Sequence, residues 1–299
     1  MFRTKQGAAQ GALFRGDRLT LRLMLLPSLI GVGVFFLIPF GVVVYDAFIG
    51  NPFAPSFVGV DNFVSLMQNE SFRIAVGNTA VFLGVTLPLA VCLPLALSAL
   101  LEHNIPGKSK FRTFFLSPVV VPTASVALIW QVFFHQNGVV NDLMGLIGAD
   151  GVDWLRTAGY DKAVIVLLFV WKNLGYNMVL FTAALSSVPR ELLEAAEIDG
   201  AGAWKRFWHI KLRYLSPAVL FVTLLSLINS FKIFREVYLL SGSYPSEGLY
   251  MLQHFMNNIF YSLDYPKLSA ATVLMTLVLA VALGVFLVLE ERFRRDVEE

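Results

Sequence analysis

The chain has 299 residues, of which 57% are hydrophobic and only 15% are charged, with a formal net charge of +2. A soluble protein of this composition would lack the polar surface to cover its apolar side chains. The composition therefore indicates a membrane protein, and the small net charge gives no sign of a nucleic-acid partner. The single cysteine, Cys92, excludes a disulfide framework.

Six apolar segments are long enough to cross a bilayer as helices, which takes roughly 20 residues. They are residues 23–45, 78–101, 111–134, 163–185, 217–240 and 268–289. Several of them contain proline or polar residues, which are tolerated where neighbouring helices can bond to them. The sequence thus predicts an all-α, polytopic membrane protein with six transmembrane helices.

The first apolar segment predicts a retained helix, because it is too long for a signal peptide and no small-residue cleavage site follows it. We expect residues 1–22 to form a cytoplasmic arm and 23–73 to form the first helix with an extracytoplasmic loop. Residues 74–290 are expected to form the transmembrane core, and 291–299 a cytoplasmic tail. Most of the 23 basic residues lie in the arm, after the second and fourth spans and in the tail. This distribution predicts that both termini are cytoplasmic.

Motifs of enzyme chemistry are incomplete in this sequence. Gly107-Lys108-Ser109 matches the end of a phosphate-binding loop, but Glu102 stands where that loop needs its first glycine. None of the four histidines pairs with another ligand at metal-binding spacing. We therefore predict no catalytic residue, no metal site and no cofactor bound by this chain.

The fourth and fifth apolar segments carry polar side chains at similar depths. In the fourth segment these are Asn173, Tyr176 and Asn177, and in the fifth Asn229 and Lys232. From the 1.5 Å rise per residue, Asn173 lies roughly 15 Å from the outer end of its segment and Asn229 roughly 18 Å from the cytoplasmic end of its own. Both are near the middle of a hydrocarbon core about 30 Å thick. Such groups either line a water-filled path or bond neighbouring helices. We take these five residues as the candidate solute pathway and leave that alternative open for each.

The two basic residues near the outer end of the fifth segment have several possible roles. Three roles are open to Lys232 and Arg235, namely an ion pair with Glu236, contact with an extracellular protein, and the lining of an outer gate. The sequence does not rank these alternatives. The role of Lys172 in the fourth segment is likewise open.

Residues 187–217, between these two segments, predict a helix, a glycine turn and a second short helix. Pro189 suits the start of the first helix, and Gly200 is placed to end it in a left-handed turn. The second helix is expected to begin near Ala203, with an apolar side that includes Phe207 and Ile210. On physical grounds alone, this hairpin either lies on the lipid headgroups or docks on another protein.

The same segment resembles the EAA loop of binding-protein-dependent ABC importer permeases. The similarity rests on Glu194-Ala195-Ala196, then Asp199-Gly200-Ala201, followed by Phe207, Ile210, Leu212 and Pro217. Arg213 replaces a proline of the family pattern, which affects the expected bend after Leu212. Residues 57–63 and 230–245 resemble further stretches of the carbohydrate branch, and the permeases of maltose and glycerol-3-phosphate importers are the most similar group.

This resemblance implies a type I ABC importer fold in a bacterial plasma membrane. It implies that the EAA loop couples the chain to an ATPase through Glu194, Ala195, Ala196, Asp199, Gly200, Ala201, Phe207 and Ile210. The implied partners are a second homologous permease, two cytoplasmic ATPase subunits that use ATP and Mg, and an extracytoplasmic solute-binding protein. The implied solute is a sugar or sugar derivative.

The rival hypothesis is a stand-alone secondary transporter or channel for a small polar solute. Such a protein is expected to show an intramembrane ion relay and often an inverted repeat. No convincing repeat is visible, and no acidic residue lies well inside a predicted span.

Overall fold

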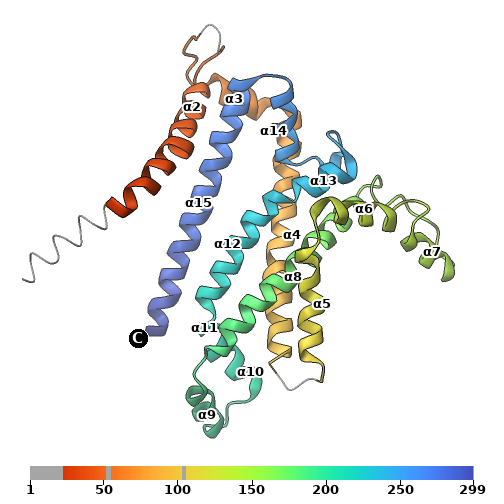
Figure 1. The fold of residues 1–299 in the computed structure, drawn as a ribbon, viewed down its shortest axis with the longest axis vertical. Coiled ribbons are helices and arrows are strands. Elements are labelled where there is room, and N and C mark those ends of the chain that lie inside the picture. The colour runs from red at the N-terminus through yellow and green to blue at the C-terminus, as the bar shows by residue number, and fades with distance from the viewer. Residues whose placement is uncertain (1–22, 52–54, 103–105, 299) are drawn as a thin grey trace, which may run out of the picture. The chain divides into compact units, whose positions relative to one another are not determined.

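The computed structural model describes residues 23–51, 55–102 and 106–298, and their regular structure is helical apart from one isolated bridge between Ile49 and Phe57 (Figure 1). A first helix runs over Leu23–Asp46. It contains the π-helical turn η1 (Gly33–Leu37) and α2 (Ile38–Asp46). The other elements are α3 (Asp61–Gln68), α4 (Glu70–Leu100), α5 (Lys108–Val120), α6 (Thr123–Phe133), α7 (Val139–Leu146), α8 (Tyr160–Ser186), α9 (Arg190–Ile198), α10 (Ala203–Arg206), η2 (Phe207–Lys211), α11 (Leu212–Tyr214), α12 (Ser216–Lys232), α13 (Phe234–Ser241), η3 (Glu247–Leu249), α14 (Leu252–Tyr261) and α15 (Tyr265–Glu298). The predicted arm 1–22 lies outside the described residues.

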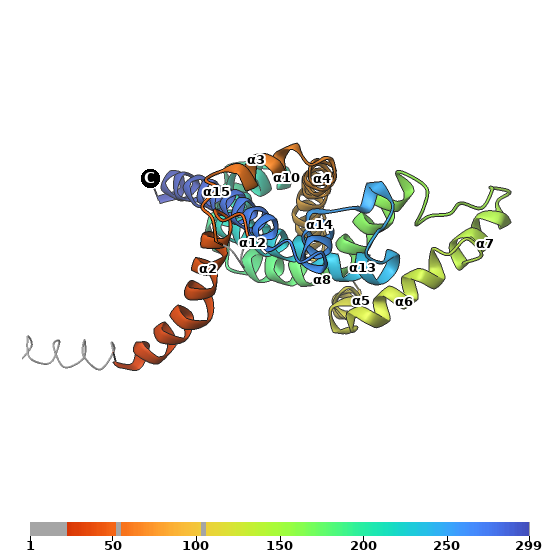
Figure 2. The ribbon, with the colours of Figure 1, turned by 90° about the horizontal axis from the view of Figure 1, so that it is seen from above.

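Five of the six predicted spans correspond to helical segments long and apolar enough to cross a membrane. The third differs, because residues 111–134 form two helices, α5 and α6, that meet at 103°. Pro122 causes this break: the residue before a proline is disfavoured in helical conformation, and Val121 is accordingly extended, with ψ of 128°. Figure 2 shows α6 and α7 extending to one side of α5 as a result.

The chain divides into two compact units, Met1–Leu66 with Leu263–Met275 and Met67–Ser262 with Thr276–Glu299. In the first unit, Asn62 holds the segment that follows the first helix. Its side-chain amide donates to the carbonyl oxygens of Ala47 and Ile49, both at 2.9 Å. The π-helical turn η1 precedes Pro39, whose ring cannot accommodate the normal helical bond to the preceding turn.

The second unit is built around α8, which contacts α4, α5 and α12 (Figure 1). Its core includes Phe82 of α4, Trp130 of α6, Phe169 of α8 and Val237 of α13. The rings of Phe82 and Phe169 meet edge to face at 5.5 Å. Helix α5 packs tightly on α8 at Gly175, where an added Cβ would lie 1.9 Å from the Phe115 carbonyl oxygen. A small residue at this point permits the close helix approach typical of membrane bundles.

Candidate functional site

A cavity of about 430 Å³ lies among α5, α8, α12 and α13. Four of the five predicted pathway residues line it, namely Asn173, Tyr176, Asn229 and Lys232. Lys172 and Glu236 add charged groups, and Val119, Phe169, Leu225 and Ile233 supply apolar walls. The structure therefore brings together polar and charged side chains that the sequence separates by up to 64 positions, the distance from Lys172 to Glu236.

Two amides join α8 to α12 at this cavity. Asn229 donates from Nδ2 to Asn173 Oδ1 at 3.0 Å, and Asn173 Nδ2 donates to the carbonyl oxygen of Phe169 at 2.8 Å. Asn173 is buried, whereas Asn229 is partly exposed. Two hydrogen bonds thus fix the Asn173 amide, whereas Asn229 keeps part of its amide exposed to the cavity.

An ion pair between Lys172 of α8 and Glu236 of α13 closes another side of the cavity. Lys172 also donates to the Thr123 hydroxyl at 3.3 Å, so that the first residue of α6 joins the group. The Glu236 side chain is only 4% exposed. A buried carboxylate of this kind requires a cation close by, and Lys172 provides it.

This ion pair shows which cation neutralises Glu236, a point that the sequence left open. Glu236 is bonded to Lys172, not to Lys232 or Arg235, both of which are exposed. Sequence reasoning missed the pairing because Lys232 stands four positions before Glu236, the spacing of a local helical pair, while the true partner lies on another helix. Helix α12 ends at Lys232 and α13 begins at Phe234, so the two local residues belong to different helices.

Asn177, the fifth predicted pathway residue, is not part of the cavity lining. Its side chain is buried and donates to the Ala90 carbonyl oxygen at 2.9 Å and to the Ser226 hydroxyl at 3.0 Å. These bonds tie α8 to α4 and to α12. The geometry matches the interhelical alternative considered for such residues.

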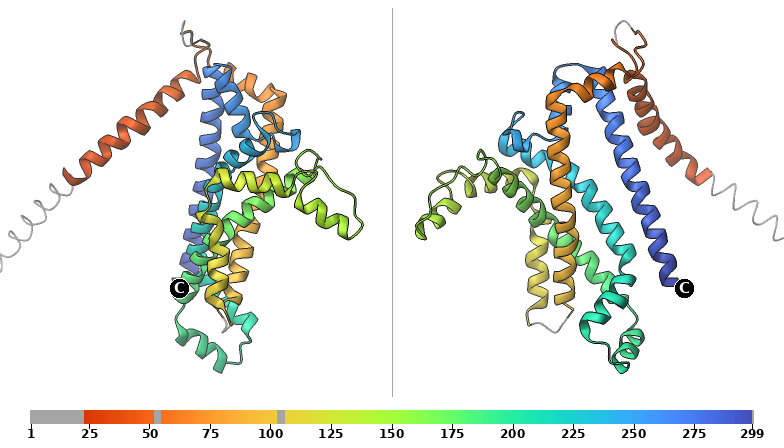
Figure 3. Two further views of the ribbon diagram at one scale, coloured as in Figure 1. Left: turned by 45° about the vertical axis from the view of Figure 1, so that its right-hand side comes forward. Right: turned by 180° about the vertical axis from the view of Figure 1, so that it is seen from behind.

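The segment between α8 and α12 forms a helical hairpin that projects beyond the end of α8 (Figure 3). Helix α9 begins at Arg190, directly after Pro189, and ends at Ile198. Two residues later, Gly200 adopts a left-handed conformation with φ of 81°. Ala201 N–H bonds to the Ala196 carbonyl at 2.8 Å, and Gly200 N–H bonds to the Glu197 carbonyl at 3.0 Å. These two bonds are the Schellman motif that a C-terminal glycine makes possible.

Two ion pairs hold the hairpin in shape. Arg206 Nη1 lies 2.5 Å from Glu197 Oε2 and joins α10 to α9. Lys211 Nζ lies 2.6 Å from Glu102 Oε2 and joins η2 to the residues after α4. Surface pairs of this kind stabilise little individually, but together they restrict the hairpin's orientation.

The hairpin has two apolar sides, one packed against the transmembrane helices and one facing away from them. Leu193 and Ile210 pack against Phe181, Leu185 and Leu215 of the transmembrane unit. Apolar residues on the other side stay in solvent; Ile198 is 87% exposed and Trp204 74%. Of the eight predicted coupling residues, Glu194, Ala195, Asp199 and Gly200 are exposed, and Ala196, Ala201, Phe207 and Ile210 are partly buried.

In the described part of the chain, no group of three or more His, Cys, Asp or Glu side chains is arranged to hold a metal ion. Gly107, which the sequence places in an incomplete phosphate-loop pattern, has φ of 80° and immediately precedes α5. Gly107 is therefore a turn residue between two membrane helices, whereas a phosphate-binding loop joins a strand to a helix.

Comparison with known proteins defines the class to which this fold and hairpin belong. Residues 92–297 match the family described as binding-protein-dependent transport system inner membrane component. The lactose transport system permease protein LacF of Rhizobium radiobacter is 31% identical, covering 89% of this chain and 91% of that protein. The trehalose/maltose transport system permease protein MalF of Thermococcus litoralis is 30% identical, covering 92% and 94%.

The fold is likewise that of a known transporter. A crystal structure of a bacterial ABC transporter involved in the import of the acidic polysaccharide alginate superposes with a TM-score of 0.82, at 24% identity, over 94% of this chain and 99% of that one. The chain therefore belongs to the inner-membrane permeases of binding-protein-dependent ABC transporters, as its EAA-like segment predicts.

Membership of this family confirms several predictions together. The chain is an all-α, multi-pass subunit of the inner membrane, and it is not an enzyme. Permeases of this family have no cofactor of their own, and their partner subunits hydrolyse ATP. The rival hypothesis of a stand-alone transporter or channel does not fit the family.

Proposed function

We propose that this permease passes a sugar or sugar derivative through the membrane after an extracytoplasmic binding protein delivers it. Two cytoplasmic ATPase subunits supply the driving force, and a second, related permease completes the pathway. ATP hydrolysis is coupled to the permease through the hairpin of α9 to α11.

One observation carries this proposal: the hairpin and the cavity lie along the same two helices. Asn173 precedes the hairpin end of α8, at Ser186, by about 20 Å, and Asn229 follows the hairpin end of α12, at Ser216, by the same distance, from the rise of 1.5 Å per residue. A rigid-body movement of the hairpin would therefore move both asparagines. Such a connection is a physical link between a docking surface and a pathway.

The chemistry of the cavity supports a sugar as the solute. A sugar offers hydroxyl groups and a weakly apolar ring face, and the cavity provides amides, a phenol and apolar walls. Lys232, which has no ion-pair partner among the described residues, adds a cation for a solute that carries phosphate or carboxylate. Relatives named for lactose and for sn-glycerol-3-phosphate span both kinds of solute.

The exposed side of the hairpin, which faces away from the transmembrane helices, supports docking on an ATPase subunit. An exposed apolar patch beside charged groups is typical of a protein interface. Ile198 and Trp204 supply the patch, and Glu194 and Asp199 are acidic groups on the same hairpin. The hairpin lies at the end that the distribution of basic residues assigns to the cytoplasm, so both termini are proposed to be cytoplasmic. A periplasm-dependent reporter fused after Glu299 should be inactive; an active fusion would reverse this orientation.

The solute class is tested by measuring solute-stimulated ATP hydrolysis of the reconstituted complex over a panel of sugars, sugar phosphates, amino acids and metal ions. We expect stimulation by one sugar or sugar derivative. Stimulation by amino acids or metal ions, and by no sugar, would overturn the solute class.

The pathway is tested by replacing each buried or half-buried asparagine in turn. Asn229→Leu should reduce uptake while the complex still assembles, because it removes a cavity amide. The control, Asn177→Leu, should reduce assembly, because it removes two bonds between helices. Unchanged uptake in Asn229→Leu would remove Asn229 from the pathway.

A further inference from the structure

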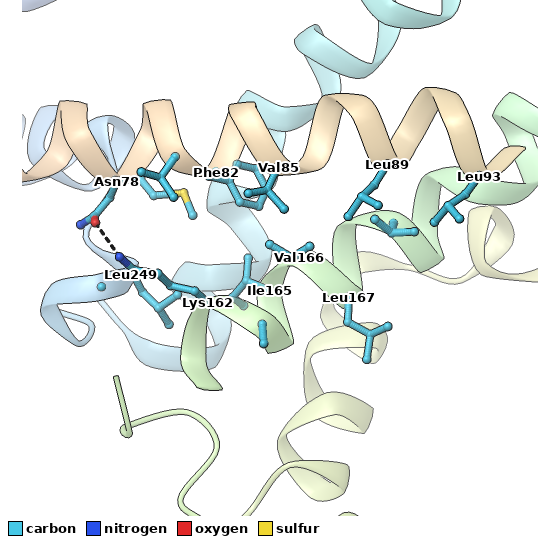
Figure 4. Close-up of a pocket in the computed structure, with 15 residues that line it drawn as sticks. Asn78, Phe82, Val85, Leu89, Leu93, Lys162, Ile165, Val166, Leu167 and Leu249 are labelled. Atoms are coloured by element: carbon cyan, nitrogen blue, oxygen red, sulfur yellow. Dashed lines mark hydrogen bonds between the residues drawn. The ribbon is translucent and has the colours of Figure 1, made fainter. Parts of the chain in front are cut away.

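A second cavity, of about 480 Å³, forms a groove between α4 and α8 (Figure 4). On α4 its wall is a stripe of four residues spaced four apart, namely Val81, Val85, Leu89 and Leu93. On α8 the wall includes Val166 and Leu167. Val81 and Leu167 are both more than half exposed, so apolar side chains here are open to whatever surrounds the helices.

The length of the groove corresponds to one leaflet of a bilayer. From Val81 to Leu93 the helix rises about 18 Å at 1.5 Å per residue. Half of a hydrocarbon core about 30 Å thick is about 15 Å. Both α4 and α8 are long and apolar enough to cross a membrane, so a groove between them lies at the depth of acyl chains.

One end of the groove is cationic. Lys162, the third residue of α8, lies there beside Asn78 of α4, and its Nζ donates to Asn78 Oδ1 at 3.2 Å (Figure 4). The neighbouring carboxylate of Asp161 accepts bonds from the Gly159 and Lys162 backbone N–H groups and from the Ser246 hydroxyl. Among the described residues, no carboxylate forms an ion pair with Lys162. Its positive charge is therefore not neutralised by a carboxylate of the described residues.

We propose that a membrane phospholipid with an anionic headgroup occupies this groove. Its acyl chain lies along the stripe from Val81 to Leu93, and its phosphate accepts from Lys162 Nζ. Asn78 does not contact the phosphate, because its amide already donates to the carbonyl oxygens of Glu247 and Tyr250; it positions the ammonium group. The pairing of an apolar trough one leaflet long with a cation at its interfacial end fits a lipid on both counts. The proposal concerns a different face of α8 from the solute cavity and does not depend on the solute.

The first test identifies what lies in the groove. A photoreactive phenylalanine analogue is placed at Val85, or at Leu167, in the assembled complex, which is then irradiated in vesicles of phosphatidylglycerol and phosphatidylcholine. Mass spectrometry of the chain should show a lipid adduct at both positions. A peptide adduct from another subunit would overturn the proposal, because the groove would then be a protein interface.

The second test measures headgroup selectivity by native mass spectrometry of the complex released from nanodiscs containing equal amounts of the two lipids. Lys162→Gln should reduce retained phosphatidylglycerol about fivefold relative to phosphatidylcholine, the effect expected of one interfacial cation. Lys162→Arg should restore it. Arg73→Gln, which removes a cation near the same end of α4 but outside the groove, is the matched control and should have no effect.

A third variant blocks the trough itself. Leu89→Trp should lower retention of both lipids, whereas Val76→Trp, at an exposed position of α4 outside the groove, should not. Retention that is unchanged in both Lys162→Gln and Leu89→Trp would overturn the proposal. The photoreactive test uses native Lys162 and remains decisive if either variant fails to assemble.

Discussion

At the residue scale, the buried ion pair in the cavity makes the sharpest energetic prediction. Glu236→Gln should destabilise the chain by about 3 kcal/mol, the lower end for a broken buried pair, because Lys172 keeps 25% of its side chain exposed. The double variant Lys172→Met with Glu236→Gln should recover most of this loss, since no uncompensated charge remains. A denaturation series in detergent measures both. Additive losses in the double variant would show that the two charges do not interact.

His254 provides a pH-dependent prediction outside the spans. The imidazole is fully buried, its Nδ1 accepts from the Met251 N–H, and its ring meets Phe234 at 4.8 Å. Burial disfavours the charged form and lowers the pKa of His254 from 6.5 to about 4. The neutral ring is therefore the folded form. The neutral imidazole contributes about 3 kcal/mol to the free energy of unfolding. This contribution is fully present above pH 6.5 and is lost as the pH decreases from 6.5 toward 4.

His254→Gln is the test of this assignment, because glutamine can accept the same bond without titrating. Thermal unfolding of the native chain should shift downward between pH 6.5 and 4.5 by more than that of the variant. Equal shifts in both proteins would show that other groups control the acid response.

At the element scale, the close approach of α5 and α8 depends on Gly175. Gly175→Ala should destabilise the chain by about 1–3 kcal/mol, the range for overpacking, because the added methyl group meets the backbone of α5. Gly84→Ala is the matched control, since Gly84 lies in α4 with nothing within 4 Å of a Cβ. That substitution should be neutral or stabilising by up to ~1 kcal/mol. If both variants behave alike, the contact between α5 and α8 is looser than the structure indicates.

A second prediction about a single element concerns the turn of the hairpin. A Cβ at Gly200 meets no atom within 4 Å, so only its left-handed backbone opposes substitution. Gly200→Val should disturb the turn by about 1–2 kcal/mol and weaken ATPase association, whereas Gly200→Asn, which tolerates this conformation better, should retain it. Co-purification of the ATPase subunit measures the difference. Equal co-purification in both variants would separate the turn from coupling.

The elements also show what the sequence could and could not predict. Long apolar segments and the glycine turn of the hairpin were predictable, because length, composition and left-handed backbone are local properties. The break at Val121 was not, although Pro122 was visible, since transmembrane helices often continue through proline. Likewise, the partner of Glu236 depends on the packing of α8 against α13, which no local spacing reveals.

At the scale of the whole molecule, α8 and α12 connect the hairpin to the cavity. A solute pathway that opens through partner ATPases needs such a connection, whereas a transporter driven by an ion gradient does not. Four of the five pathway residues predicted from sequence share one cavity, and the fifth, Asn177, holds the helices that frame it.

The most direct test is uptake of a labelled sugar, selected by the solute panel, into proteoliposomes that contain the complete complex. We expect uptake only when ATP is supplied on the side of the hairpin and the loaded binding protein on the opposite side, and loss of uptake in Gly200→Val. Uptake driven by a proton or sodium gradient without ATP would contradict a permease coupled to ATPase subunits through the hairpin.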